Sequence, residues 1–139
     1  MDDLQRFIDA QENDYADALA EIKKGRKRTH WMWYIFPQIQ GLGFSEMSER
    51  YAIKDLDEAE AYINHPVLGQ RLIEICSELL KLQSNDAHEI FGSPDDMKLR
   101  SSMTLFAALP DAYPVFKSVI DKFFNGAMDG ATLRLLGEL

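Results

Sequence analysis

The sequence has little of the cysteine that cross-links small secreted proteins and none of the long apolar segments that anchor proteins in membranes. It contains 139 residues and a single cysteine, Cys76, so no disulfide can form within the chain. No run approaches the roughly 18 consecutive apolar residues of a transmembrane helix. The first residues, Met1, Asp2 and Asp3, lack the basic and apolar segments of a signal peptide. We therefore expect a cytoplasmic protein, with no membrane association, that is stabilised by its own core.

Positive charge is also scarce. The chain has 15 Lys and Arg against 23 Asp and Glu, which gives a net charge of −8 and argues against general nucleic-acid binding. The cations are concentrated in one run, which consists of Lys23, Lys24, Arg26, Lys27 and Arg28. Such a run on an acidic protein suits the capture of one small anion, such as a phosphate. The alternative is the solvated end of a helix, where cations meet the negative end of the dipole.

Motifs for cofactors and metals are missing. Gly41 and Gly43 begin a G-x-G pattern, but Glu46 stands where a dinucleotide-binding fingerprint requires glycine. The three histidines are far apart in the sequence, and none has a second His or Cys at metal-ligand spacing. We therefore expect no bound cofactor and no metal site.

Helical periodicity dominates the chain. Apolar residues recur at three- and four-residue intervals over residues 4–22 and form a broad stripe over residues 67–82. Cys76 falls on that stripe, so we expect a buried, inert thiol. No segment alternates apolar and polar residues with hairpin turns, which is the pattern of a strand. We predict an all-α fold, one compact domain over residues 1–139 with about seven or eight helices, several of them short.

Several polar residues suit helix N-caps, because their side-chain oxygens can accept hydrogen bonds from the first N–H groups of a helix. They are Ser45, Asp55 and Asp86. The segment from Thr29 to Phe36 is apolar on nearly every side, which fits either a short buried helix capped by Thr29 or a buried strand. We favour the helix. Ser93, Pro94, Asp95 and Asp96 form a further helix-start pattern with acids in the first turn.

Residues 28–38 combine aromatic and basic side chains in a way that an ordinary core does not require. Stacking faces beside cations suit a ligand with a planar base and a phosphate. The alternative is that both tryptophans fill the core with their indole N–H groups satisfied. The candidate binding residues are Lys27 and Arg28 for phosphate, Trp31 and Trp33 for stacking, and Gln38 and His30 for orientation, with His30 also a candidate general base.

A second candidate surface lies on the predicted helix that follows Pro94. Helical spacing lets Lys98, Ser101 and Ser102 converge, which makes Lys98 a further candidate ligand-binding residue. Asp96 is a candidate catalytic acid, although carboxylates in a first turn more often stabilise the helix end.

Long contiguous blocks resemble the bacterial family called domain of unknown function 1810. They are GRKRTHWMWYIFPQIQGLG at residues 25–43, HPVLGQRL at residues 65–72 and IFGSPDDMKLRSSMTLFAAL at residues 90–109. The resemblance implies a small, single-domain, mainly helical cytoplasmic protein without an established activity. Some members carry the label calpastatin, which nothing in this sequence supports.

A weaker similarity connects residues 65–92 to the NADAR (NAD and ADP-ribose associated) proteins, which are N-glycosidases of ADP-ribosylated or ribosylamine substrates. Glu89 takes the place of their acidic residue, followed by the pair Phe91 and Gly92, in which the family's Trp is replaced by Phe91. The similarity implies that Glu89 is a candidate catalytic carboxylate, since glycosidic cleavage requires one near the anomeric carbon.

The sequence therefore supports two alternative functions. The first is binding, with N-glycosidic processing as its catalytic extension, of a phosphorylated nucleotide-like or ADP-ribose-like small molecule. The second is a non-catalytic helical protein-interaction module, in which the same aromatic residues anchor a partner. Burial separates them, because tryptophans that line a concave pocket favour the ligand and a flat exposed patch favours the partner. The sequence does not indicate an oligomeric state.

Overall fold

The computed structural model describes residues 4–138. Met1 to Asp3, which bear on the expected lack of a signal peptide, lie outside the described residues. Within residues 4–138 the fold is all-α, as predicted, and none of its helices is long and apolar enough to cross a membrane. The helices in this range are α1 (Gln5–Lys23), α2 (Met32–Ile35), α3 (Glu46–Arg50), α4 (Leu56–Asn64), α5 (Leu68–Lys81), α6 (Ala87–Phe91), α7 (Asp95–Ala107), α8 (Pro114–Phe124) and α9 (Gly130–Leu135).

The helix count over residues 4–138 is nine, slightly above the expectation, because α2, α3, α6 and α9 are only four to six residues long. Helices of one turn have little periodicity for a sequence pattern to show. The long amphipathic helices α1 and α5 occupy the two segments in which the apolar repeat was clearest.

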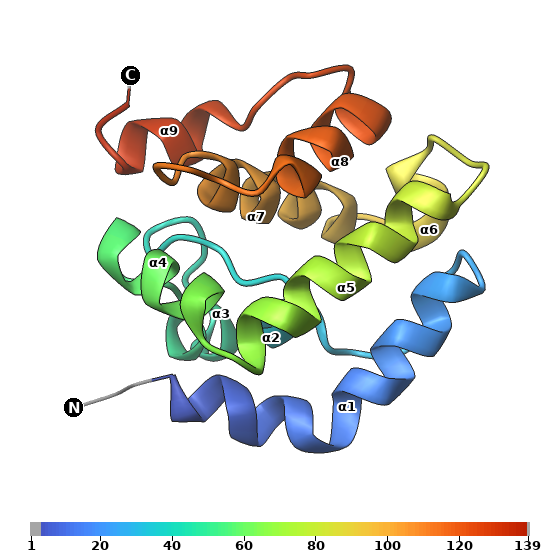
Figure 1. The fold of residues 1–139 in the computed structure, drawn as a ribbon, viewed down its shortest axis with the longest axis horizontal. Helices are drawn as coiled ribbons and strands as arrows, with labels where there is room; N and C mark the ends of the chain where they lie inside the picture. The colour runs from blue at the N-terminus through green and yellow to red at the C-terminus, as the bar shows by residue number, and fades with distance from the viewer. Residues whose placement is uncertain (1–3, 139) are drawn as a thin grey trace.

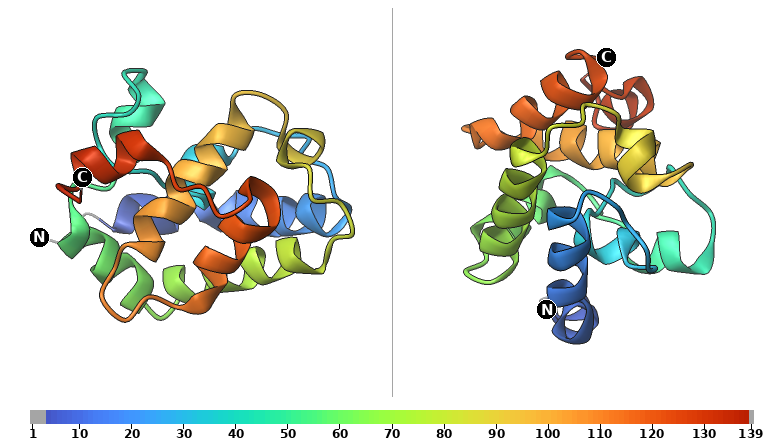
Figure 2. Two further views of the ribbon diagram at one scale, coloured as in Figure 1. Left: turned by 90° about the horizontal axis from the view of Figure 1, so that it is seen from above. Right: turned by 90° about the vertical axis from the view of Figure 1, so that its right-hand side faces the viewer.

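Helix α5 is the central element of the fold. It packs against α1, α4 and α8, and in Figure 1 it runs diagonally between α1 at the lower edge and the group of α7, α8 and α9 above. The right-hand view of Figure 2 shows the same separation, with α1 below and α8 and α9 above. The predicted stripe forms its buried face, and the Cys76 thiol is fully buried there, 3.6 Å from the sulfur of Met103.

Three of the four expected N-caps are confirmed. The side chains of Ser45, Asp55 and Asp86 accept hydrogen bonds from N–H groups in the first turns of α3, α4 and α6. The expected cap at Thr29 is wrong, because α2 begins at Met32 and the Thr29 hydroxyl donates instead to the Glu21 carboxylate. Thr29 lies two positions before Trp31, the residue that precedes the helix, and its hydroxyl makes a charge-assisted bond to Glu21.

The segment between α2 and α4 leaves the helical core and returns to it. An isolated parallel bridge between Ile39 and Ile53 closes this excursion, with the N–H of Ile53 donating to the carbonyl of Gln38 at 2.8 Å. Gly41 adopts a φ of +105°, and a Cβ there would stand 3.2 Å from a Leu135 methyl carbon of α9. The excursion, which carries α3, is thereby held beside α9 and forms one wall of a pocket.

Candidate functional site

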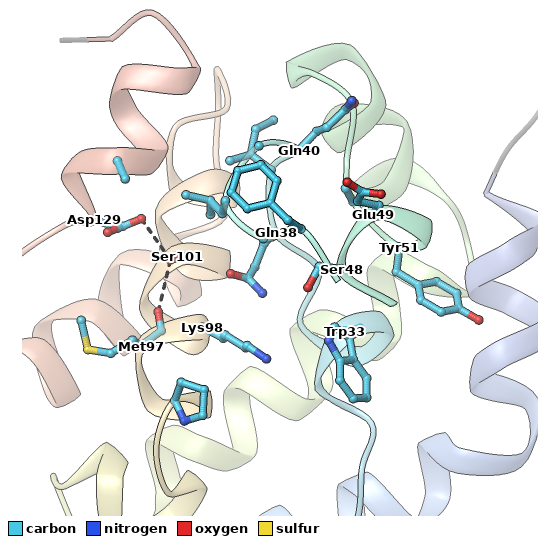
Figure 3. Close-up of a pocket in the computed structure, with 18 residues that line it drawn as sticks. Trp33, Gln38, Gln40, Ser48, Glu49, Tyr51, Met97, Lys98, Ser101 and Asp129 are labelled. Carbon is cyan, nitrogen blue, oxygen red and sulfur yellow. Dashed lines mark hydrogen bonds between the residues drawn. The ribbon is translucent and has the colours of Figure 1, made fainter. Parts of the chain in front are cut away.

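A pocket of about 630 Å³ lies between this excursion and the α7 helix (Figure 3). That volume is within the usual range for sites that bind small molecules. Its walls come from distant parts of the chain: Trp33 of α2, the residues 38–44, 48, 49, 51 and 52 of the excursion, Pro94, Met97, Lys98 and Ser101 at α7, and Asp129 and Ala131 at α9.

Four polar side-chain ends point toward one another in the pocket. They belong to Trp33, Gln38, Ser48 and Lys98, whereas the ring of Tyr51 is directed away from them (Figure 3). The ammonium of Lys98 lies 5.3 Å from the centre of the Trp33 ring, within cation–π range. Trp33 and Gln38 are both half-buried, so each is held by the fold and still open to the pocket.

Lys98 is positioned by charges on α7 and on the loop after α1. Its Nζ lies 3.6 Å from Asp95 Oδ1, one helical turn earlier, and Asp95 Oδ2 lies 3.0 Å from the Nζ of Lys27. The Lys27 side chain is only 7% exposed. Lys27 therefore acts behind the pocket wall, through Asp95, rather than lining the pocket itself.

The far wall is fixed by the cap of α9. The carboxylate of Asp129 accepts hydrogen bonds from the hydroxyl of Ser101 at 3.0 Å and from the N–H and hydroxyl of Thr132. This arrangement joins α7 to α9. The predicted convergence of Lys98, Ser101 and Ser102 holds for the first two only, because Ser102 is fully buried and is not among the pocket-lining residues.

The rim of the pocket is apolar. Phe44 and Met97 line it with 82% and 47% of their surfaces exposed, and Leu135, which contacts the turn at Gly41, is 49% exposed. Sequence reasoning missed all three. The available signal was Phe44, a large apolar residue between Gly43 and Ser45, where turn-forming neighbours keep a side chain out of the core.

The charge around the pocket is mixed. Lys98 is the only Lys, Arg or His among the described lining residues, and Glu49 and Asp129 are the acids. Among the described residues no group of three or more His, Cys, Asp and Glu is placed to hold a metal ion.

Trp31 and Trp33 have separate roles. Trp31 is 1% exposed, and its indole N–H donates to Glu21 Oε1 at 3.0 Å. It is therefore a core residue with its polar atom satisfied, which was the alternative left open for both tryptophans.

Glu21 also accepts bonds from the N–H groups of Arg28 and Thr29. Burial by itself would raise the pKa of Glu21, but these bonds, with that from the Thr29 hydroxyl, lower it to about 2.

The remaining candidate residues lie outside the pocket lining. Arg28 and His30 are exposed on the loop before α2, and Glu89 is exposed on α6. Asp96 lies at the start of α7, where its Oδ2 is 3.6 Å from the Nδ1 of His88. The structure thus brings together Trp33, Gln38 and Lys98, and the roles suggested for the other residues stay predictions.

Comparison with known proteins supports the fold and the family. The sequence matches the family described as protein of unknown function (DUF1810) over residues 1–136. The fold is similar to the crystal structure of the conserved hypothetical protein Rv1873 from Mycobacterium tuberculosis, with a TM-score of 0.95 and 47% identity over 97% of this chain and 96% of that chain. The search of curated proteins returned no match. On the family match and this close similarity, the chain belongs to the DUF1810 family.

Proposed function

We propose that this protein binds a nucleotide-like small molecule in the pocket between the excursion and α7. The observation that carries this proposal is that Trp33 and Gln38, from one segment, and Lys98, from the distant helix α7, carry different chemistry and line one pocket of suitable size. In the complex the base packs against an aromatic ring, and Gln38 and Ser48 bond to its polar groups or to the sugar. Lys98 provides the charge that attracts a phosphate.

The chemistry of the lining supports this ligand class. Trp33 and Phe44 supply apolar ring surface, and the polar ends of Trp33, Gln38, Ser48 and Lys98 converge, as polar groups do in small-molecule sites. A second cavity of about 310 Å³, between α4 and the start of α8, contains none of the residues that the sequence singled out.

Binding can be tested by a thermal-shift screen with ADP-ribose, NAD, nucleotides, nucleosides and sugar phosphates. A ligand present at a hundred times its dissociation constant stabilises a protein by about 2.7 kcal/mol, which raises the midpoint by several degrees. Hits are then measured by calorimetry. We expect Lys98→Ala to weaken binding of a phosphorylated hit about tenfold, as for loss of one charge-assisted contact, and the charge-matched control Lys24→Ala to leave it unchanged.

The same measurement separates this pocket from the basic run. If Arg28→Ala abolishes binding while Lys98→Ala does not, the phosphate is held on the loop before α2 and the pocket assignment is wrong. If no compound in the screen shifts the midpoint, the nucleotide-like ligand itself is excluded.

N-glycosidic cleavage extends this proposal and is supported only by the sequence similarity to NADAR proteins. The carboxylate it needs could come from Glu89 or Asp96, as that similarity and the sequence suggest, or from Glu49 or Asp129, which line the pocket. Incubation with ADP-ribosylated and ribosylamine substrates, followed by chromatography, would show release of the base or ribose. Loss of release in one of the four carboxylate-to-amide variants identifies the residue, and no release by the unmodified protein rejects the reaction.

The apolar rim favours a second candidate function, the capture of a protein partner. Phe44, Met97 and Leu135 together give an exposed apolar border of the kind found at interaction sites. Self-association is the simplest case to test, by light scattering across a concentration series. A dimer that Phe44→Ser dissociates would make the rim an interface, and a monomer at all concentrations removes a second copy of the chain as the partner.

A further inference from the structure

The charges around the pocket restrict its ligand further. Resting on the proposed function, we infer that the pocket takes a nucleoside or a nucleoside monophosphate and discriminates against ligands that carry a diphosphate. The ligand that the pocket favours therefore carries less negative charge than an ADP-ribose-like ligand does.

The pocket has few cations. Lys98 is the only cationic residue among the described lining residues, and it already faces Asp95 at 3.6 Å. Lys27 compensates Asp95 at 3.0 Å, so this group of three charges presents one net positive charge to the pocket. One phosphate can use that charge, and a second phosphate finds no second cation among the described lining residues.

Two acids also line the pocket. Glu49 lines the pocket from the excursion and Asp129 lines it from the cap of α9. A second phosphate in the pocket would meet two like charges instead of a second cation, and like-charge repulsion disfavours it.

The N-terminal end of α7 does not supply the positive charge that a second phosphate would need. The N–H groups of Asp96, Met97 and Lys98 are already bonded to the carbonyls of Gly92 and Pro94. The carboxylates of Asp95 and Asp96 also occupy the first turn, where an incoming phosphate would otherwise benefit from the helix dipole. These three N–H groups are therefore already bonded within the chain, and the first turn already carries two negative charges.

The remaining polar groups suit uncharged partners. The amide of Gln38 can donate and accept, the Ser48 hydroxyl can do both, and the indole N–H of Trp33 can donate. The side-chain ends of all three point into the same region (Figure 3). Ribose hydroxyls and the edge of a base offer matching donors and acceptors.

The test is a charge series measured by calorimetry at low ionic strength without divalent ions. Nucleosides, monophosphates and diphosphates of adenine, guanine, cytosine and uracil are titrated into the full chain, together with ADP-ribose. For the base that binds best, we expect the diphosphate to bind at least about tenfold more weakly than the monophosphate. Glu49→Gln should narrow that ratio by about twofold to fivefold, since an exposed charge acts weakly.

The control is Glu12→Gln on the exposed face of α1, which removes the same charge away from the pocket and should leave the ratio unchanged. A diphosphate that binds as tightly as its monophosphate, or more tightly, overturns this inference and leaves the proposed function standing. Binding of ADP-ribose in preference to every monophosphate overturns the inference alone, and failure of every compound, ADP-ribose included, to bind overturns the proposed function and the inference with it. An equal change of the ratio in Glu12→Gln and Glu49→Gln also overturns the inference, because the discrimination would then come from net charge alone.

Discussion

Trp31 and Trp33 show how one residue of separation decides the role of a side chain. Trp31 precedes α2 with a non-helical backbone (φ −140°, ψ 6°), whereas Trp33 lies within that helix, so the two side chains leave the backbone in different directions. Trp31 consequently enters the core and bonds to Glu21, while Trp33 reaches the pocket beside Lys98. The composition of the segment predicted an aromatic site, but only the direction of each side chain shows which tryptophan serves it.

Glu21 holds the loop that precedes α2, and its removal should loosen that loop. Its carboxylate accepts bonds from the Arg28 and Thr29 N–H groups, the Thr29 hydroxyl and the Trp31 indole. We expect Glu21→Gln to lower the free energy of unfolding at pH 7 by about 1–3 kcal/mol, the usual cost of leaving such donors poorly paired. Urea denaturation measures the difference.

The pH dependence of that difference gives a sharper check. Because the pKa of Glu21 is lowered from 4.5 to about 2, its stabilising effect is complete above about pH 4.5 and is lost as the pH falls toward 2. The gap between the unmodified protein and Glu21→Gln should therefore shrink over this window. A gap that stays constant from pH 6 to pH 2 would show that the carboxylate charge is not what holds the loop.

At the scale of elements, Gly69 sets how closely α4 and α5 approach. A Cβ at this position would lie 2.0 Å from the carbonyl oxygen of Ile63, which is backbone and cannot rotate away. We expect Gly69→Ala to destabilise the protein by at least about 1–3 kcal/mol through overpacking, despite the higher helix propensity of alanine. Thermal denaturation followed by circular dichroism tests this, and an unchanged or raised midpoint would contradict the close approach.

Much of the helical structure could be predicted from the sequence because its signals are local. The apolar repeats of α1 and α5, and the caps at Ser45, Asp55 and Asp86, depend on residues within one or two turns. The cap at Thr29 failed because α2 begins later, at Met32, after a segment that Glu21 of α1 holds through the Arg28 and Thr29 N–H groups.

The site could be predicted only in part, because residue types are visible in the sequence but the contacts that bring them together are not. Trp33, Gln38 and Lys98 were identifiable by residue type, but their meeting depends on the bridge between Ile39 and Ile53, which carries no sequence pattern. Asp129 lines the pocket only because α9 folds back onto α7, a contact that spans many residues of chain.

At the scale of the whole molecule, the basic run and the pocket are separate features. Arg28 is exposed on the loop after α1, and of the run only Lys27 is linked to the pocket, through Asp95 and then Lys98. The protein thus has a net negative charge and a partly buried series of alternating charges, Lys27, Asp95 and Lys98, that ends at the pocket. A ligand site built this way depends on fit and hydrogen bonding more than on long-range attraction.

The most direct test of the account uses the two tryptophans as reporters. In the ¹⁵N-labelled protein the two indole N–H signals are assigned with Trp33→Phe, and the best monophosphate from the charge series is then added to saturation. We predict that the Trp33 indole signal shifts, because it lies in the pocket, and that the Trp31 signal stays in place, because Glu21 holds it in the core. Saturable binding that leaves the Trp33 signal unchanged would contradict the central claim that this pocket is the ligand site.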